Sequence, residues 1–302
     1  MSDNRWDQQI KQFFDYLRTT RQLSDHTLSN YQRDLKKFVG YCKKLDINDA
    51  TNVHHSDVRQ WVASEHRQGL ASKSLQRSLS AVRSFYKFHS RQGIEHNPAQ
   101  GVQAPKAKKT LPKTLNADHV QQFLSLDGDS WITIRDRAML ELFYSSGLRL
   151  SELVNLDLLD LDLKDKLVTV TGKGNKTRQL PVGSYALKAL DAWLKSRATM
   201  NCPLEALFIS TRNTRLTQRA VQSRLKKYSV AQGMDSNVHP HMLRHSFASH
   251  MLESSGDLRA VQELLGHANM STTQVYTHLD FQHLSKVYDK AHPRANRKTP
   301  RS

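Results

Sequence analysis

A segment that cannot be helical divides this chain at about a third of its length. Pro98, Pro105 and Pro112 lie within residues 97–113, where each proline interrupts helical periodicity. The same stretch is rich in lysine, so it predicts a basic linker between two domains. This linker either lies along a nucleic-acid backbone or is a plain solvated spacer. Its lysines are Lys106, Lys108, Lys109 and Lys113.

Residues 1–96 predict a bundle of four amphipathic helices, in which apolar residues recur every three or four positions. We expect Ser24 or Asp25 to cap the second helix, and Ser56 and Ser72 to precede the third and the fourth. The polar side of the fourth helix carries basic residues, which form either a solvated face or part of a binding surface. These are Lys73, Arg77, Arg83, Lys87 and Arg91. The apolar sets are Trp6, Ile10, Phe13 and Leu17; Leu28, Tyr31, Leu35 and Phe38; Val58 and Val62; and Leu75, Leu79, Val82 and Tyr86.

Residues 114–292 predict a second, mostly helical domain with one small antiparallel sheet, followed by a basic tail at 293–302. The strands are expected at Leu167–Thr171 and Thr177–Val182, joined by a glycine-rich turn. Ala206–Ser210 is a candidate for a further strand. Helices are expected at Ile134–Phe143, ending at Gly147, at Leu187–Leu194, and from Gln218 onward. The fold class is therefore mainly α.

The charge of the chain favours a polyanionic partner. Lysine and arginine number 45 against 28 acidic residues, a net charge of +17, and the excess is shared almost equally by the residues up to Lys109 and those after it. Two basic domains suggest two surfaces facing one polyanion, although a merely soluble basic protein is the simpler alternative.

Cys42 and Cys202 match no metal spacing and indicate reduced intracellular thiols. With neither a secretory signal nor an 18-residue apolar run, a cytoplasmic protein without a membrane span is expected.

Six residues of the second domain form one chemical set. Five are cationic or can become so, and the sixth carries a phenol. Such a set can hold a phosphodiester while a tyrosine oxygen attacks the phosphorus, since guanidinium groups fork onto phosphate oxygens and a further group protonates the leaving oxygen. Each residue taken alone has an ordinary surface or packing explanation. The set is Arg149, Lys173, His241, Arg244, His267 and Tyr276.

Local context supports several of these candidates. His241 and Arg244 are three apart after Pro240, so they share one face at a helix start, where anions bind readily. Lys173 lies in the turn between the two strands. The turn GKGNK lacks the P-loop pattern, so ATP binding is not expected. His241 and His245 have a spacing that suits a metal, but no HExxH motif is present, so neither a metal nor another cofactor is expected.

With these motifs the chain resembles the tyrosine recombinases (integrases). The stretch LESSGDLRAVQELLGHANMSTTQVYTHLDFQHL and the ending AHPRA are similar to the Xer recombinases, and LDFQHL favours their XerC type. The resemblance implies a helical core-binding domain and a catalytic domain of the tyrosine recombinase fold. It also implies roles: Arg149, His241, Arg244 and His267 grip the phosphate, Lys173 is the general acid, and Tyr276 forms a 3′-phosphotyrosyl bond.

The resemblance further implies a site-specific recombinase that resolves chromosome and plasmid dimers before cell division. Its implied partners are a double-stranded DNA recombination site, a XerD-type paralogue in a heterotetramer, and the FtsK-type DNA translocase. Two other functions remain open: a type IB topoisomerase, which shares the chemistry, and a non-catalytic DNA-binding regulator on the same fold.

The sequence after the tyrosine predicts an apolar helix stripe. Phe281, Leu284, Val287 and Tyr288 recur at helical spacing. This helix either packs on its own domain or docks into a groove on a neighbouring subunit. The resemblance favours the second arrangement.

Overall fold

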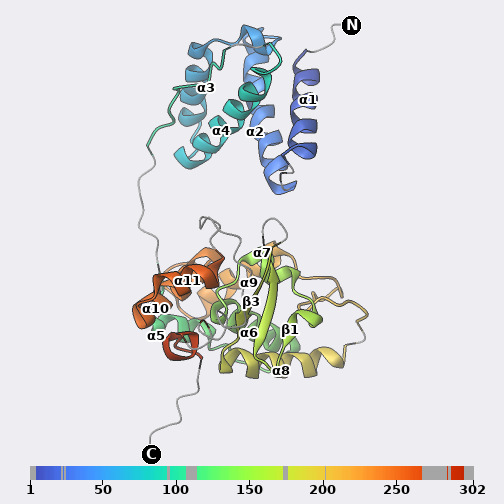
Figure 1. Cartoon of the computed structure of the whole chain (residues 1–302), viewed down its shortest axis with the longest axis vertical. Coiled ribbons are helices and arrows are strands. Elements are labelled where there is room, and N and C mark those ends of the chain that lie inside the picture. Colours follow the sequence, from blue (N-terminus) through green and yellow to red (C-terminus); the bar gives the residue numbers. More distant parts are fainter. Residues whose placement is uncertain are drawn as a thin grey trace, which may run out of the picture. The chain divides into compact units, whose positions relative to one another are not determined.

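The computed structural model divides the chain into two compact units, Met1–Thr110 and Leu111–Ser302. Each is described by itself (Figure 1). No helix within the described residues is long and apolar enough to cross a membrane. The described residues are 5–21, 23, 25–93, 96–106, 114–172, 176–200, 202–266, 284 and 287–295.

The N-terminal unit is the expected four-helix bundle (Figure 1). The predicted apolar stripes face one another, and Trp6, Phe38 and Phe85 meet at its centre. Trp6 also donates its indole N–H to the carbonyl of Ile47, which holds the loop after the second helix. The elements are α1 (Arg5–Thr19), α2 (Asp25–Lys44), the short η1 (Ala50–Asn52), α3 (His55–Arg67) and α4 (Ser72–His89).

Two predicted helix starts differ from the structure. The third helix begins at His55, so Ser56 lies inside it, and the carboxylate of Asp57 accepts a hydrogen bond from the His54 backbone N–H instead. The fourth begins at Ser72 itself, after an Ala71 cap that makes no side-chain bond. In both cases a serine near the boundary was a correct sign of a helix start but not its cap.

Part of the predicted linker packs on the N-terminal unit. Ala99 and Val102 are buried in the core of the bundle. Arg83 donates hydrogen bonds to the carbonyls of both residues. Arg77 forms a bidentate ion pair with the buried Asp34 of α2. Two of the five arginines and lysines expected on a polar face of α4 therefore have structural partners.

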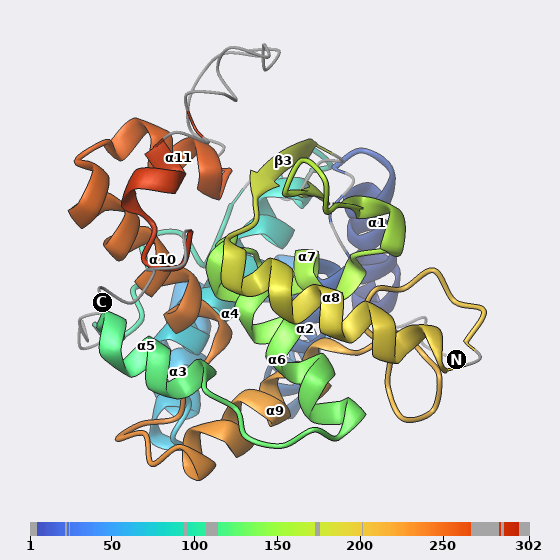
Figure 2. The ribbon, with the colours of Figure 1, turned by 90° about the horizontal axis from the view of Figure 1, so that it is seen from below.

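The second unit is built around one buried helix. Almost every residue of α6 (Trp131–Ser145) from Arg135 onward is buried, which is typical of a helix surrounded by others. Helix α8 (Ser184–Ala198) packs along it, as Figure 2 shows from below. The polar groups within this core are paired: Asp136 binds Arg135 and the hydroxyl of Tyr228. The other helices are α5 (Ala117–Leu124), α7 (Leu150–Asn155), η2 (Leu158–Asp160), α9 (Gln218–Ala231), α10 (Pro240–Ser255) and α11 (Leu258–Leu265).

The small antiparallel sheet has the order β1-β2-β3, with strands Leu161–Asp162, Leu167–Thr171 and Thr177–Pro181. It confirms both strands expected around the glycine-rich turn. The register pairs Thr171 with Thr177, so the turn is at the tip of a regular hairpin. The strand expected at Ala206–Ser210 does not form. Ala206 and Ile209 make only isolated bridges, to Asp157 and Arg215, because no partner strand continues beside them.

The C-terminal segment packs on its own unit. Leu284 and Tyr288 are buried in the core around α6, so the docking on a neighbouring subunit favoured above is not what this single chain shows. Tyr288 shares a 2.6 Å hydrogen bond with Ser145. Arg294 forms a bidentate ion pair with the buried carboxylate of Glu141 and also lies over the Tyr185 ring. Phe281, the first residue of the predicted stripe, lies outside the described residues.

The Glu141–Arg294 pair should contribute strongly to stability. Arg294→Met leaves a buried carboxylate without its cation, so we expect the free energy of unfolding to fall by about 3–5 kcal/mol. Adding Glu141→Gln should recover about half of this loss, because it removes the uncompensated charge. Urea unfolding followed by circular dichroism measures both changes.

The matched control is Lys195→Met, which removes an ion pair with Asp191 in which both side chains are exposed. Its cost should stay below about 1 kcal/mol. If Arg294→Met and Lys195→Met lowered the free energy of unfolding by equal amounts, the C-terminal segment would not depend on the Glu141–Arg294 ion pair.

Candidate active site

Arg149 stands at the turn between α6 and α7, where the backbone reverses at Gly147. Gly147 has φ +55°, a conformation that favours glycine, and a Cβ there would lie 2.3 Å from the ring of Phe247 on α10. The glycine thus brings α10 against the turn. Arg149 then caps α7, with its side chain half-exposed. The helix end expected at Gly147 is therefore followed directly by the turn that carries Arg149.

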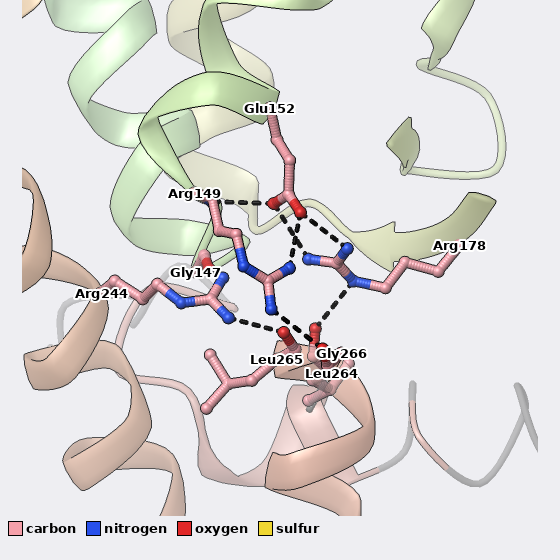
Figure 3. Close-up of polar contacts among 8 residues, drawn as sticks. All are labelled: Gly147, Arg149, Glu152, Arg178, Arg244, Leu264, Leu265 and Gly266. Carbon is pink, nitrogen blue, oxygen red and sulfur yellow. Dashed lines mark hydrogen bonds and ion pairs between the residues drawn. The ribbon is translucent and has the colours of Figure 1, made fainter. Parts of the chain in front are cut away.

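A buried carboxylate organises the arginines around this turn (Figure 3). Glu152 accepts hydrogen bonds from the Arg149 backbone N–H at 2.8 Å and from the Arg149 guanidinium at 2.7 Å. Arg178, from β3, binds the same carboxylate with both terminal nitrogens, at 2.9 and 3.0 Å. Two guanidiniums and one backbone amide therefore share one carboxylate.

The protonation of Glu152 follows from this arrangement. Burial alone would raise its pKa, but the hydrogen bonds and charges of Arg178 and Arg149 lower the pKa to about 2. The side chain is only 2% exposed, so it is an ionised buried group that depends on its partners. Near neutral pH the cluster therefore carries one negative charge among several positive ones.

Arg244 reaches the same place from α10. Its guanidinium donates to the carbonyl of Gly147 at 2.5 Å and to that of Leu265, at the end of α11, at 2.6 Å. Burial lowers its pKa to about 10, helped by the positive charges of Arg149 and Arg178 and opposed by Glu152. The two arginines expected to grip one phosphate are therefore close enough to repel each other.

His241 lies in the first turn of α10, which begins at Pro240 as the sequence predicted. It is exposed, three residues before Arg244 on the same helix. His239 caps this helix by accepting a hydrogen bond from the Met242 N–H. Burial and the neighbouring His241 both lower the pKa of His239. The first turn of α10 therefore presents His241 while a neighbouring imidazole serves as cap.

Lys173, His267 and Tyr276 lie outside the described residues. The structure does describe the chain up to their neighbours. The N–H of Gly172 donates to the carbonyl of Lys176 at 2.8 Å, which closes the hairpin on either side of Lys173. Gly266, the residue before His267, caps α11 with φ +63°. Of the six candidates, the structure thus brings Arg149 and Arg244 together at the end of α11 and places His241 one helical turn before Arg244. The other three remain sequence predictions.

Sequence reasoning did not single out Glu152 and Arg178. A signal for Arg178 was available, because in an alternating strand it shares a face with the buried Leu180, and a charge on that face indicates a buried partner. For Glu152, the signal was a glutamate three residues after the helix cap. Neither pattern shows which residue is the partner.

Histidines elsewhere on α10 have other surroundings. His250 is buried and shares a 2.7 Å hydrogen bond with the hydroxyl of Tyr144, whereas His245 is exposed. Among the described residues no group of three His, Cys, Asp or Glu side chains is placed to hold a metal ion.

Comparison with known proteins identifies the family of the chain. Residues 113–283 match the model of the phage integrase family, and residues 10–93 match its N-terminal SAM-like domain. The chain belongs to the phage integrase family. Tyrosine recombinase XerC of Pseudomonas syringae pv. syringae (strain B728a) is 54% identical over 296 residues, 97% of this chain and 98% of the relative. Tyrosine recombinase XerC of Pseudomonas aeruginosa (strain LESB58) is 55% identical over 290 residues, 95% of each chain.

Solved structures share the fold of this phage integrase family member. The XerH site-specific recombinase bound to palindromic difH substrate has a TM-score of 0.69 at 23% identity, covering 93% of this chain and 84% of that one. The Tn1549 transposon integrase in complex with transposon right end DNA has a TM-score of 0.72 at 16% identity, covering 92% and 98%. The expected fold class, the resemblance to XerC recombinases and the enzyme class of site-specific DNA recombinase are confirmed.

The pKa of Glu152 gives a prediction about acid stability. A carboxylate whose pKa falls from 4.5 to about 2 on folding contributes stability that is complete above pH 4.5 and is lost as the pH falls towards 2. This contribution is on the order of 3 kcal/mol. Glu152→Gln should therefore be less stable than the wild type at pH 6, and the difference should shrink towards pH 3. Urea unfolding across this pH range measures it.

The control is Asp191→Asn, at an exposed carboxylate that pairs with Lys195. Its effect should be small and nearly constant with pH. If the loss of unfolding free energy in Glu152→Gln stayed constant from pH 6 to pH 3, Glu152 would not be ionised with the lowered pKa assigned to it.

Proposed function

We propose that this chain cuts and rejoins double-stranded DNA at a defined site through a covalent 3′-phosphotyrosyl intermediate. The phenol of Tyr276 gives up its proton to solvent as its oxygen attacks the scissile phosphorus, and the bond to the 5′ oxygen of the DNA breaks. The 5′ oxygen takes a proton from Lys173. In the reverse direction a 5′ hydroxyl attacks the phosphotyrosyl bond, returns the proton and releases the tyrosine. Because the covalent bond conserves the energy of the diester, rejoining needs no ATP.

The observation that carries this proposal is the arginine pair. Arg149 and Arg244 come from different helices and are both anchored at the end of α11. Arg149 remains 38% exposed, so part of its guanidinium faces solvent. Two guanidiniums so placed can bind the non-bridging oxygens of one phosphate and stabilise the charge that grows on them during attack. His241 adds an imidazole on the same helix as Arg244, and His267 follows the helix end that both arginines bind.

The biological role follows from the XerC relatives. We infer that the chain acts with a XerD-type paralogue, as two pairs of subunits on one DNA site, and resolves chromosome and plasmid dimers at cell division. An FtsK-type DNA translocase is the proposed activator. The +17 charge, spread over both units, suits two basic surfaces around one duplex. Because its substrate is the chromosome, the proposed location is the cytoplasm.

The nucleophile can be tested directly. Tyr276→Phe removes only the attacking oxygen, so DNA binding should persist while covalent capture is lost. The substrate is a nicked duplex from which the short cut strand diffuses away, built on a sequence selected by the wild-type protein from genomic fragments. The wild type should give an adduct that survives denaturing electrophoresis, and Tyr276→Phe should give none.

The control is Tyr185→Phe, at a tyrosine whose ring lies beneath Arg294. It should form the adduct normally. An adduct in Tyr276→Phe would reject Tyr276 as the nucleophile, and no adduct with the wild type would favour the non-catalytic regulator. Equal cleavage of selected and scrambled duplexes would favour a topoisomerase.

The roles of acid and clamp can be separated with a modified substrate. Lys173→Ala and Arg244→Ala should each slow cleavage, Arg244→Ala by about two to four orders of magnitude. A substrate with sulfur at the 5′ bridging position has a leaving group that needs no proton. Lys173→Ala should therefore approach the wild-type rate on it, whereas Arg244→Ala should stay slow. Rescue of both variants alike would remove the basis for Lys173 as general acid.

A further inference from the structure

Three arginines bind three consecutive carbonyls at the C-terminal end of α11. Arg178 donates to Leu264 at 3.3 Å, Arg244 to Leu265 at 2.6 Å and Arg149 to Gly266 at 2.9 Å (Figure 3). The last carbonyls of a helix have no partners within the helix and form the negative end of its dipole. Guanidinium groups from β3, α10 and the α7 cap therefore hold this helix end from three directions.

Arg178 differs from the other two arginines in its exposure. Its side chain is only 9% exposed against 38% for Arg149, so it is poorly placed to meet DNA. It also packs against Gly266, where a Cβ would lie 3.1 Å from the guanidinium carbon. Among the described residues, the hydrogen bonds of its side chain go to Glu152 and to Leu264. Arg178 is thus committed to contacts within the protein.

The contacts of Arg178 limit how Glu152 can hold Arg149. Arg178 places one nitrogen on each oxygen of the carboxylate, at 2.9 and 3.0 Å. Arg149 makes a single side-chain bond to Glu152, through Nη1, and a single bond to Gly266, through Nη2. Without Arg178, both carboxylate oxygens could turn to the Arg149 guanidinium and form the bidentate pair that arginine prefers. That pair would compete with a phosphate for the same nitrogens.

Arg178 also connects three parts of the proposed site. It lies on β3, the strand that leaves the hairpin turn containing Lys173. Through Glu152 it is bonded to the helix that follows Arg149, and through Leu264 to the helix that precedes His267. Displacing this one side chain would release restraints on all three.

We propose that Arg178 is a positioning residue for strand cleavage, which orients Arg149 through Glu152 and fixes the end of α11. This rests on the function proposed above. Arg178 does not touch the phosphate, so its effect on the reaction passes through the orientation of Arg149. Its loss should therefore matter most when the substrate carries the negative charge that Arg149 meets.

The test uses two nicked duplexes of the same sequence, one with an ordinary scissile phosphate and one with a methylphosphonate, which lacks the negative charge. Arg178→Met should slow covalent capture on the phosphate by about 100-fold, the scale of a misplaced catalytic group. On the methylphosphonate most of this defect should disappear, because there is no anionic oxygen for Arg149 to bind. A defect of equal size on both substrates would overturn the proposal.

The matched control is Arg197→Met. Arg197 is also a buried arginine of this unit, and it binds the backbone carbonyls of Leu204 and Ala206 instead of the cluster in Figure 3. Its effect, if any, should be the same on both substrates. Absence of wild-type capture on the phosphate would count against the proposed function itself, which distinguishes that failure from a failure of the Arg178 role.

A second set of variants tests the same role of Arg178 if Arg178→Met does not fold. Arg178→Lys keeps the charge but cannot bind both carboxylate oxygens, so this variant should fold and slow capture on the phosphate less than Arg178→Met does. As with Arg178→Met, most of its defect should disappear on the methylphosphonate. In a Glu152→Gln background, changing Arg178 to Lys should have little further effect on cleavage of the phosphate. Additive defects of Arg178→Lys and Glu152→Gln would show that Arg178 does not act through Glu152.

Discussion

The buried carboxylate of Glu152 is the interaction on which the candidate site depends. Three positively charged side chains meet beside the α6–α7 turn, and their mutual repulsion would separate them without a central anion. Glu152 holds two of them directly, while the carbonyls of Gly147 and Leu265 hold Arg244. Removing any one partner of this buried ionised group is therefore costly to stability.

Backbone geometry supplies the other half of the arrangement. Gly147 lets α10 approach the turn before Arg149, and Gly266 ends α11 with its last carbonyls directed to the arginines. Both glycines have a left-handed conformation; an added Cβ would clash with Phe247 at Gly147 and would crowd Arg178 at Gly266. The polar side chains of the candidate site therefore converge because the ends of helices meet there, rather than their faces.

The sequence predicted the architecture well, since apolar periodicity and proline reveal helices and their interruption directly. It also singled out Arg149, His241 and Arg244, because residue chemistry together with local strings such as HPHMLRH is informative. It missed Glu152 and Arg178, whose importance lies in pairing across 26 positions of the chain, which local patterns cannot show. The strand expected at Ala206–Ser210 failed for the same reason, as a strand needs a partner. The third and fourth helices began earlier than predicted, because a serine near a helix start does not show which residue is the cap.

The excess of positive charge in the arginine cluster has a consequence for how the DNA-free protein responds to salt. A divalent oxyanion such as sulfate, which can bridge Arg149 and Arg244, should stabilise the folded state beyond a monovalent salt of equal ionic strength, because it binds only the assembled cluster. The same anion would compete with the DNA phosphate for these nitrogens. The identity of the buffer anion, and not only its concentration, should then set the apparent affinity of this protein for DNA.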